Sequence, residues 1–254
     1  MSPHLRLSLT LLCLLLPGPA SAAKDLTVAV ASNFQAPMRQ IAEQFERDTG
    51  HALVLVFGSS GKFHAQIRQG APFDVFLSAD QVKPAQLESD DLAGSRMTYA
   101  IGRLALWSAQ PGRRIDGPDV LRNPQLGKLA LANPRVAPYG AAAMQTLQHL
   151  GLDALSRSHA VMGENISQTF QFVASGNAEL GFVALSQLIG RAEPGSWWLV
   201  PEQLHQPIAQ DAVLLTQARH PQAGRALLAF LASESAGEII RAHGYTLPTL
   251  VPQP

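Results

Sequence analysis

The chain has 254 residues, with 19 Lys and Arg against 19 Asp and Glu, so its formal net charge is zero. This balance leaves no basic face for nucleic acid or for anionic lipid. The length suffices for one large domain or for two lobes that each bury a core.

The first 22 residues have the pattern of a secretory signal peptide. Arg6 precedes an apolar run of about ten residues, Leu7 to Leu16, and Ala20-Ser21-Ala22 is a small-x-small cleavage signature. The run is too short to span a bilayer as a helix. The alternative, a buried N-terminal helix, is disfavoured because Pro17-Gly18-Pro19 would end it before it could pack. We therefore expect residues 1–22 to be removed and the mature protein to be periplasmic.

The only cysteine, Cys13, lies inside this predicted signal peptide. A lipoprotein signal needs small residues just before the cysteine, whereas Leu11 and Leu12 stand there. The mature chain is thus expected to form no disulfide and no thiolate metal site. Its histidines are isolated, and no His-x-His or His-Glu-x-x-His pattern occurs, so neither a zinc site nor a cofactor is expected.

Short apolar strands alternate with helices in the first half of the mature chain. Leu26–Ala31 predicts a strand, and Ser32-Asn33 opens a helix whose apolar residues recur at helical spacing as far as Phe45. A second helix follows the turn Gly58-Ser59-Ser60-Gly61. Further strands are predicted over residues 53–57 and 74–79. This alternation is typical of a mostly parallel sheet with helices on its faces.

The second half of the chain repeats this order of elements. Helices are expected after Pro138-Tyr139-Gly140 and after Gly163-Glu164-Asn165, and two more within Pro221 to His243. Strands are predicted over residues 128–132, 159–162 and 180–184.

Two comparable halves predict two α/β lobes. Tyr99–Trp107 and Ile208–Thr216 are strand-like and would connect them. We expect residues 24–101 in the first lobe, 102–214 in the second, and 215–254 back in the first. A single doubly wound domain remains the alternative, because the order of elements alone supports two lobes.

Four predicted helices begin directly after a strand, at a small polar or glycine-containing turn. Ligands of open α/β sheets lie beyond the carboxyl ends of the strands, where helix N-termini offer free backbone N–H groups and the positive end of the dipole. The hydroxyl groups of Ser32 and Ser60 and the Asn33 amide would add donors. Four such helix ends, two from each lobe, could surround one small anion. Each of these residues alone is equally consistent with an ordinary helix cap or loop.

A secreted serine hydrolase or phosphatase is the alternative of another class. Ser60 would be its nucleophile, and His64, on the same helix face, its base. The turn Gly58-Ser59-Ser60-Gly61 lacks the second glycine of a nucleophile elbow, and with Lys62 it lacks the Walker spacing. The sequence therefore favours a binding protein over an enzyme.

At these same turns, the sequence resembles the periplasmic molybdate-binding proteins of ABC transporters, which are type II periplasmic binding proteins. The resemblance runs in order along essentially the whole mature chain. It is carried by Leu26–Asn33, Phe57–Gly61, Gln66–Phe76, Ser78–Asp80, Ala132–Pro134, Ala137–Gly140, Gly163–Ile166, Gly176–Ala184 and Gly244-Tyr245.

This resemblance implies two α/β lobes with mixed, mostly parallel sheets, joined by a two-strand hinge and closing on a tetrahedral oxyanion. One pattern in the family adds a tyrosine just after the Gly-Phe-Val strand, where this chain has Ala184, and we expect Asn33 to supply the missing donor. Carried over position by position, the family's ligand contacts fall on Ser32, Asn33 and Ser60 and on the backbone N–H groups of Tyr139 and Ile166.

The predicted function is a monomeric solute-binding protein that captures molybdate or tungstate and delivers it to the membrane permease of an ABC transporter. A site made only of donors suits a fully ionised dianion, whereas phosphate keeps a proton and is best recognised with a carboxylate acceptor. Glu164 is the acidic residue beside the predicted site. Sulfate or an organic anion remains an alternative ligand, because the sequence does not show the volume of the cavity.

Overall fold

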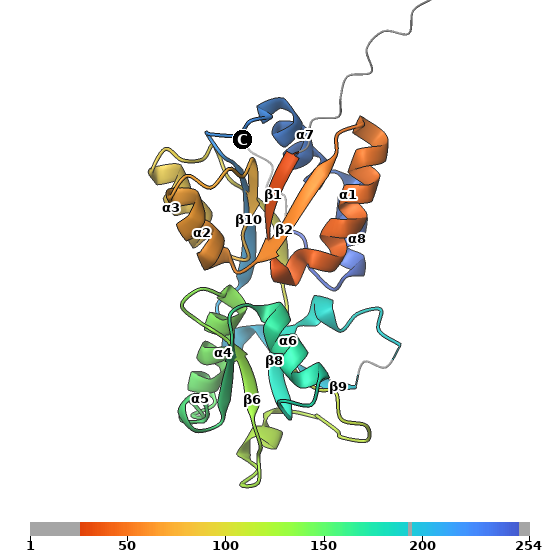
Figure 1. Cartoon of the computed structure of the whole chain (residues 1–254). Helices are drawn as coiled ribbons and strands as arrows, with labels where there is room; N and C mark the ends of the chain where they lie inside the picture. The colour runs from red at the N-terminus through yellow and green to blue at the C-terminus, as the bar shows by residue number, and fades with distance from the viewer. Residues whose placement is uncertain (1–25, 193–194, 249–254) are drawn as a thin grey trace, which may run out of the picture.

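The structure is a computed structural model that describes residues 26–192 and 195–248. Its strands form two five-stranded sheets. Each sheet belongs to its own lobe, and the two lobes lie one above the other in Figure 1. Two α/β lobes are thus confirmed over a single doubly wound domain. The predicted signal peptide, residues 1–22, lies outside the described residues.

The sheet of the first lobe has the strand order β2-β1-β3-β10-β4. Strand β1 is parallel to β2 and β3, whereas β10 is antiparallel to β3 and β4, so the sheet is mixed. The strands are β1 (Leu26–Ala31), β2 (Leu53–Gly58), β3 (Val75–Leu77), β4 (Met97–Gly102) and β10 (Ile208–Leu214). The helices are η1 (Ser32–Phe34), α1 (Gln35–Thr49), α2 (Ser60–Arg68), α3 (Val82–Ser89), α7 (Pro221–Leu231) and α8 (Glu234–Ala242).

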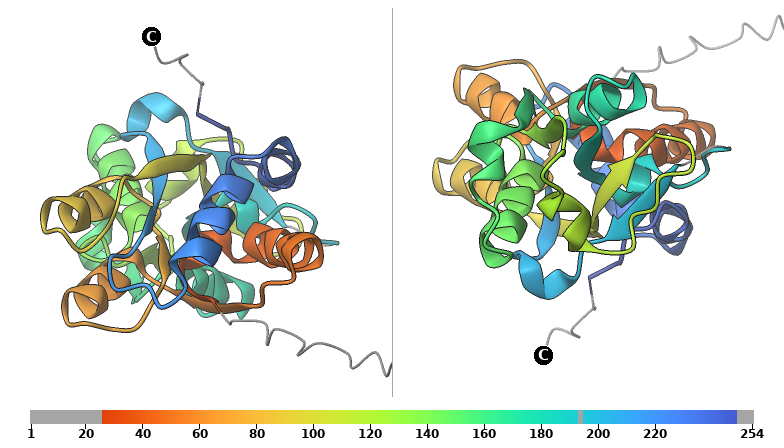
Figure 2. Two further views of the ribbon diagram at one scale, coloured as in Figure 1. Left: turned by 90° about the horizontal axis from the view of Figure 1, so that it is seen from above. Right: turned by 90° about the horizontal axis from the view of Figure 1, so that it is seen from below.

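Helices cover both faces of this first sheet. Alternate residues of a strand point to opposite faces, so Val28 and Val30 pack with α1, α7 and α8, whereas Ala29 packs with α2 and α3. Figure 2, seen from above, shows α1 and α7 on one side and α2 and α3 on the other. Helix α1 stops at Gly50, whose φ of 71° is a left-handed conformation that glycine adopts without strain.

The sheet of the second lobe has the order β7-β6-β8-β5-β9, with β6 parallel to β7 and β8 and β5 antiparallel to β8 and β9. Helix α4 packs on one face and α6 on the other. The strands are β5 (Leu104–Ser108), β6 (Leu129–Ala132), β7 (Ala160–Gly163), β8 (Leu180–Ala184) and β9 (Ser196–Leu199). The helices are η2 (Pro118–Arg122), α4 (Pro138–His149), α5 (Leu155–Ser158), α6 (Ile166–Ala174), η3 (Leu185–Gln187) and η4 (Glu202–Leu204).

The chain crosses between the lobes at two places. Strand β4 ends in the first sheet at Gly102, and β5 begins in the second sheet at Leu104. The return crossing follows β9 and leads into β10. The prediction that residues 208–214 belong to the second lobe is wrong, because β10 pairs with β3 and β4. An apolar alternation identifies a strand, but it does not show which sheet provides its neighbours.

Several short elements have no predicted counterpart, among them α3, α5 and β9. Helix α3 buries only Pro84 and Leu87, so its helical period is weak. Strand β9 lies at the edge of its sheet and is half-buried throughout. Among the described residues, no helix combines the length and the apolar character of a membrane span.

Candidate anion-binding site

A small cavity lies between the two lobes, where helix N-termini from both lobes converge. Its volume is about 10 Å³, which is the room taken by one water molecule or one compact ion and is too small for an organic ligand. The residues around it are Ala31, Ser32, Asn33, Gly58, Ser59, Ser60, Ala79, Ala137, Pro138, Tyr139, Asn165 and Ile166. All five predicted site residues are therefore brought together.

Each of the four turns at the cavity follows the carboxyl end of a parallel strand. Strands β1 and β2 lead into η1 and α2 in the first lobe, and β6 and β7 lead into α4 and α6 in the second. The backbone N–H groups of a first helical turn have no acceptor within their own helix. Two helix starts from each lobe consequently direct such groups and the positive ends of their dipoles at one space.

Ser60 provides a hydroxyl whose proton is available to a ligand. Its Oγ accepts a hydrogen bond from the backbone N–H of Ala79 at 2.9 Å, and the residue is 1% exposed. Because the oxygen is held as an acceptor, its O–H can donate into the cavity. Ser59 has another role, since it caps α2 by accepting from the N–H of Lys62 at 3.4 Å.

Ser32 begins η1, which runs directly into α1. Its carbonyl oxygen accepts a hydrogen bond from the Ser167 hydroxyl of the second lobe at 3.2 Å. The Ser32 hydroxyl has no hydrogen-bond partner within the part of the chain that the structure describes. It therefore remains available as a donor at the cavity wall.

The side chain of Asn33 turns away from the cavity and into the protein. Its Nδ2 donates to Gln210 Oε1 at 2.8 Å and to the Tyr245 hydroxyl at 3.0 Å. Both amide protons are engaged, so the expectation that this amide replaces a donor missing at Ala184 is wrong. Ala184 is itself buried at the end of β8, and its N–H donates to Gln187 Oε1 at 3.0 Å. Asn33 can offer the cavity only its backbone N–H.

Tyr139 and Ile166 lie in the first turns of α4 and α6. Pro138 opens α4, and the Asn165 side chain caps α6 by accepting from the N–H of Gln168 at 3.0 Å. The backbone N–H groups of Tyr139 and Ile166 thus lie where intrahelical bonding has not begun. The phenol of Tyr139 points elsewhere, because its oxygen accepts from Gln210 Nε2 at 3.3 Å.

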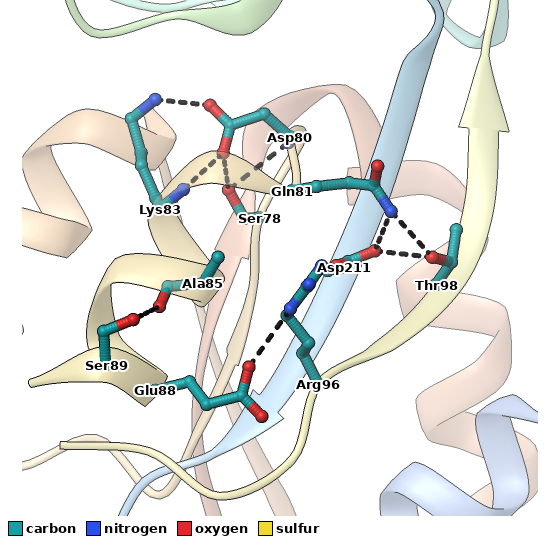
Figure 3. Close-up of polar contacts among 10 residues, drawn as sticks. All are labelled: Ser78, Asp80, Gln81, Lys83, Ala85, Glu88, Ser89, Arg96, Thr98 and Asp211. Atoms are coloured by element: carbon teal, nitrogen blue, oxygen red, sulfur yellow. Dashed lines mark hydrogen bonds and ion pairs between the residues drawn. The ribbon is translucent and has the colours of Figure 1, made fainter. Parts of the chain in front are cut away.

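No carboxylate is among the residues that line the cavity. Glu164 forms an ion pair with Lys62 of the first lobe at 2.5 Å, and its side chain is 66% exposed, so it faces solvent. Asp80 follows a cavity residue, but it pairs with Lys83 and accepts from the Ser78 hydroxyl at 3.1 Å (Figure 3). The cavity wall therefore offers donors without an ionised acceptor.

The buried carboxylate of Asp211 on β10 is also satisfied by its neighbours (Figure 3). It accepts from Thr98 Oγ1 at 2.7 Å and from Gln81 Nε2 at 3.1 Å, and it pairs with Arg96 at 3.1 Å. A buried charge needs such partners. These three protein partners are sufficient to stabilise the buried charge of Asp211, so its burial does not indicate a ligand there.

Ser60 and His64, the nucleophile and base that a hydrolase would need, do not form a hydrogen bond with each other. The Ser60 hydroxyl is bonded to Ala79, and His64 Nε2 is buried without a hydrogen-bond partner. Burial and the nearby Arg68 lower the pKa of His64. The ranges that the structure describes also contain no group of three or more His, Cys, Asp or Glu residues that could hold a metal ion.

Comparisons with known proteins agree with this architecture. Residues 26–246 match the family model described as bacterial extracellular solute-binding protein. The chain is 51% identical over 232 residues to the molybdate-binding protein ModA of Azotobacter vinelandii, covering 90% of this chain and 92% of that protein. It is 48% identical over 227 residues to ModA of Rhodobacter capsulatus, covering 89% of each.

Solved structures show the same arrangement. The periplasmic molybdate-binding protein of Azotobacter vinelandii matches with a TM-score of 0.85 at 43% identity, over 88% of this chain and 99% of that one. The sulfate-binding protein SubI from Mycobacterium tuberculosis H37Rv matches with a TM-score of 0.72 at 12% identity, over 89% of this chain and 88% of that one, and shows a shared fold alone. The chain therefore belongs to the family of bacterial extracellular solute-binding proteins.

Proposed function

We propose that this protein binds molybdate, and also tungstate, between its lobes and delivers the anion to the permease of an ABC transporter. The observation that carries this proposal is the convergence of four helix starts, two from each lobe, on a cavity of about 10 Å³. Two relatives at about half identity are molybdate-binding proteins by name. The function is binding and release, with no chemical step.

The proposed ligand contacts are neutral. The hydroxyls of Ser32 and Ser60 and the backbone N–H groups of Asn33, Tyr139 and Ile166 line the cavity, and each donates to the anion. Hydrogen bonds to a charged partner are about twice as strong as neutral ones. Donors that the fold holds in place also need no reorganisation on binding.

The absence of a carboxylate among the lining residues sets the class of anion. Near neutral pH, molybdate and tungstate are dianions without a proton, so a wall of donors satisfies them. Phosphate retains a proton at this pH, and its hydroxyl would be buried without an acceptor, which costs about 1–3 kcal/mol. The site therefore favours a fully ionised tetrahedral oxyanion.

Competition calorimetry with molybdate, tungstate, sulfate and phosphate tests this proposal. The protein is prepared from periplasmic extract, where we expect a monomeric mature chain that begins at Ala23; intact mass and sedimentation check both points. We expect one molybdate or tungstate per chain and much weaker binding of phosphate, and sulfate is the competitor of equal charge that tests the alternative ligand. Sulfate binding more tightly than molybdate, or no heat with either metal oxyanion, would contradict the proposal.

A further inference from the structure

A group of buried polar side chains lies behind the cavity and joins the two lobes. We name it the cross-lobe network. It consists of Asn33, Tyr139, Ser186, Gln210 and Tyr245, each at most 5% exposed. Only the first two belong to the candidate site, and both of them direct their side chains into the network and away from the cavity.

Tyr245 is anchored in the first lobe and reaches the second. Its ring packs edge-on against Phe34 with centroids 5.3 Å apart, and the next residue, Thr246, pairs with Ile101 of β4. Its hydroxyl donates towards Ser186 Oγ of η3, in the second lobe, at 3.0 Å. The C-terminal segment of the chain thereby contributes a direct contact between the lobes.

Three residues close a ring of hydrogen bonds at this contact. Asn33 Nδ2 donates to the Tyr245 oxygen at 3.0 Å, and the Ser186 hydroxyl donates to the Asn33 carbonyl oxygen at 2.9 Å. The Tyr245 hydroxyl shares its one proton between two acceptors, the Asn33 carbonyl oxygen of its own lobe at 2.8 Å and Ser186 Oγ of the second lobe at 3.0 Å. Burial raises the pKa of Tyr245 to about 12, so its hydroxyl keeps its proton at neutral pH. In a closed ring of low dielectric, each bond polarises and strengthens the next.

A second contact crosses in the opposite direction. Tyr139 belongs to α4 of the second lobe, and its oxygen accepts from Gln210 Nε2 on β10 of the first lobe at 3.3 Å. A Cβ at Gly102, the last residue of β4, would come within 2.1 Å of this phenol oxygen. The glycine therefore leaves room for the Tyr139 hydroxyl. Gln210 Oε1 in turn accepts from Asn33 Nδ2 at 2.8 Å.

Ser186 belongs to the second lobe, whereas Asn33 and Tyr245 belong to the first. A motion that separates the lobes at this point would therefore break the bonds of Ser186 to both residues. The apparent affinity for a ligand held between two lobes falls with the fraction of molecules in the competent, closed state. A contact that forms only on closure therefore raises affinity without touching the ligand.

We propose that Tyr245 and Ser186 are positioning residues for anion binding, which hold the lobes closed through their ring with Asn33 and so slow release of the anion. This inference rests on the proposed function. Asn33 follows Ser32 directly, so the same ring that joins the lobes also fixes the cavity wall beside a ligand donor.

Molybdate affinity and dissociation rate, measured by calorimetry and stopped-flow mixing, test the inference. For Tyr245→Phe and for Ser186→Ala, we expect binding weaker by roughly 5- to 20-fold, the range for one or two net hydrogen bonds, and mostly through faster dissociation. The double variant is expected to resemble the single ones, because both substitutions break one ring.

Ser108→Ala is the matched control for Ser186→Ala. Ser108 on β5 is equally buried, but its Oγ accepts from the N–H of Gln110 at 3.2 Å, within the second lobe and outside the cross-lobe network. We expect this variant to lower the urea midpoint and to change molybdate affinity by less than about twofold. Wild-type affinity in both Tyr245→Phe and Ser186→Ala, or equal losses in Ser186→Ala and Ser108→Ala, would overturn the inference.

A measurement without anion separates this inference from the proposed function. The N–H of Gly61 donates to the carbonyl oxygen of Val136 across the lobes at 2.9 Å, so its hydrogen exchange reports on closure. We expect faster exchange at this amide in Tyr245→Phe and unchanged exchange in Ser108→Ala. If the wild-type protein binds no molybdate, the proposed function fails, whereas unchanged Gly61 exchange in Tyr245→Phe sinks the inference alone.

Discussion

Ser60 combines two hydrogen-bonding roles in a single hydroxyl group. Its oxygen accepts from the N–H of Ala79, on the loop after β3, so its proton is left for another acceptor. Ser60 lines the cavity, where that acceptor can be an oxyanion. A side chain that is already held by one bond loses less entropy when a ligand binds.

Replacing Ser60 by Ala should therefore weaken molybdate binding strongly. Loss of a hydrogen bond to a charged group costs about 1.5–3 kcal/mol, which is roughly 10- to 150-fold in the dissociation constant. Calorimetric titration of the variant measures this loss. Ser233→Ala is the control, because Ser233 caps α8 far from the cavity by accepting from Ala236 N–H at 3.3 Å. If both variants bind molybdate alike, Ser60 does not contact the anion.

Helix α4 approaches the end of β6 unusually closely, and a glycine in its first turn permits this. A Cβ at Gly140 would lie 2.1 Å from the carbonyl oxygen of Ala132. The Ala132 oxygen is a backbone atom of β6 and cannot rotate away as a side chain would, so a larger residue at position 140 has to displace the start of α4. The close approach brings the neighbouring residue Tyr139 to the cavity wall, where we propose that its N–H donates to the anion.

Gly140→Ala tests this role of the helix start. We expect a loss of stability of about 1–3 kcal/mol from overpacking and a loss of molybdate affinity of at least about tenfold, because the Tyr139 N–H moves. Urea unfolding and calorimetry measure the two effects separately. Gly237→Ala in α8 is the control, since its nearest contact is the flexible end of Leu247 at 3.1 Å. Full affinity in Gly140→Ala would show that the position of α4 does not limit binding.

We expect the lobes to move apart when the anion enters or leaves, because residues of both lobes form the cavity wall. The cavity is of single-ion size, and both lobes contribute to its wall. Across it run the Gly61–Val136 backbone bond, the Ser167–Ser32 bond and the exposed Lys62–Glu164 ion pair. Exposed pairs of this kind contribute less than about 1 kcal/mol. The bound anion is therefore expected to add to these contacts and to the cross-lobe network in keeping the lobes closed.

Molybdate should accordingly stabilise and compact the protein together. At a free concentration 100 times the dissociation constant, we expect the free energy of unfolding to rise by about 2.7 kcal/mol. Urea unfolding with and without molybdate measures this change. Small-angle scattering should show a smaller radius of gyration with the anion, as in hinge closure around a ligand. Equal urea midpoints in both conditions would mean that the folded state does not bind molybdate.

Local patterns determined much of this protein directly from the sequence. The apolar period of Leu26–Ala31 and of the helix through Phe45 predicts β1 and α1, because burial of one face requires that spacing. Strand ends followed by polar turns predict four helix starts that could surround one anion, and the resemblance to molybdate-binding proteins assigns Ser32, Ser60, Tyr139 and Ile166 to that site. All four residues line one cavity. Parallel strands make this possible, since their carboxyl ends lie at the same edge.

Only the tertiary structure decided where the polar side chains point. Asn33 finds its partners 177 and 212 residues away, at Gln210 and Tyr245, and Glu164 finds Lys62 at a separation of 102. Likewise, β10 has the alternation of a strand, but only packing joined it to the sheet of the first lobe. Periodicity is a property of a short segment, whereas the direction of a hydrogen bond depends on which distant groups folding brings within about 3 Å.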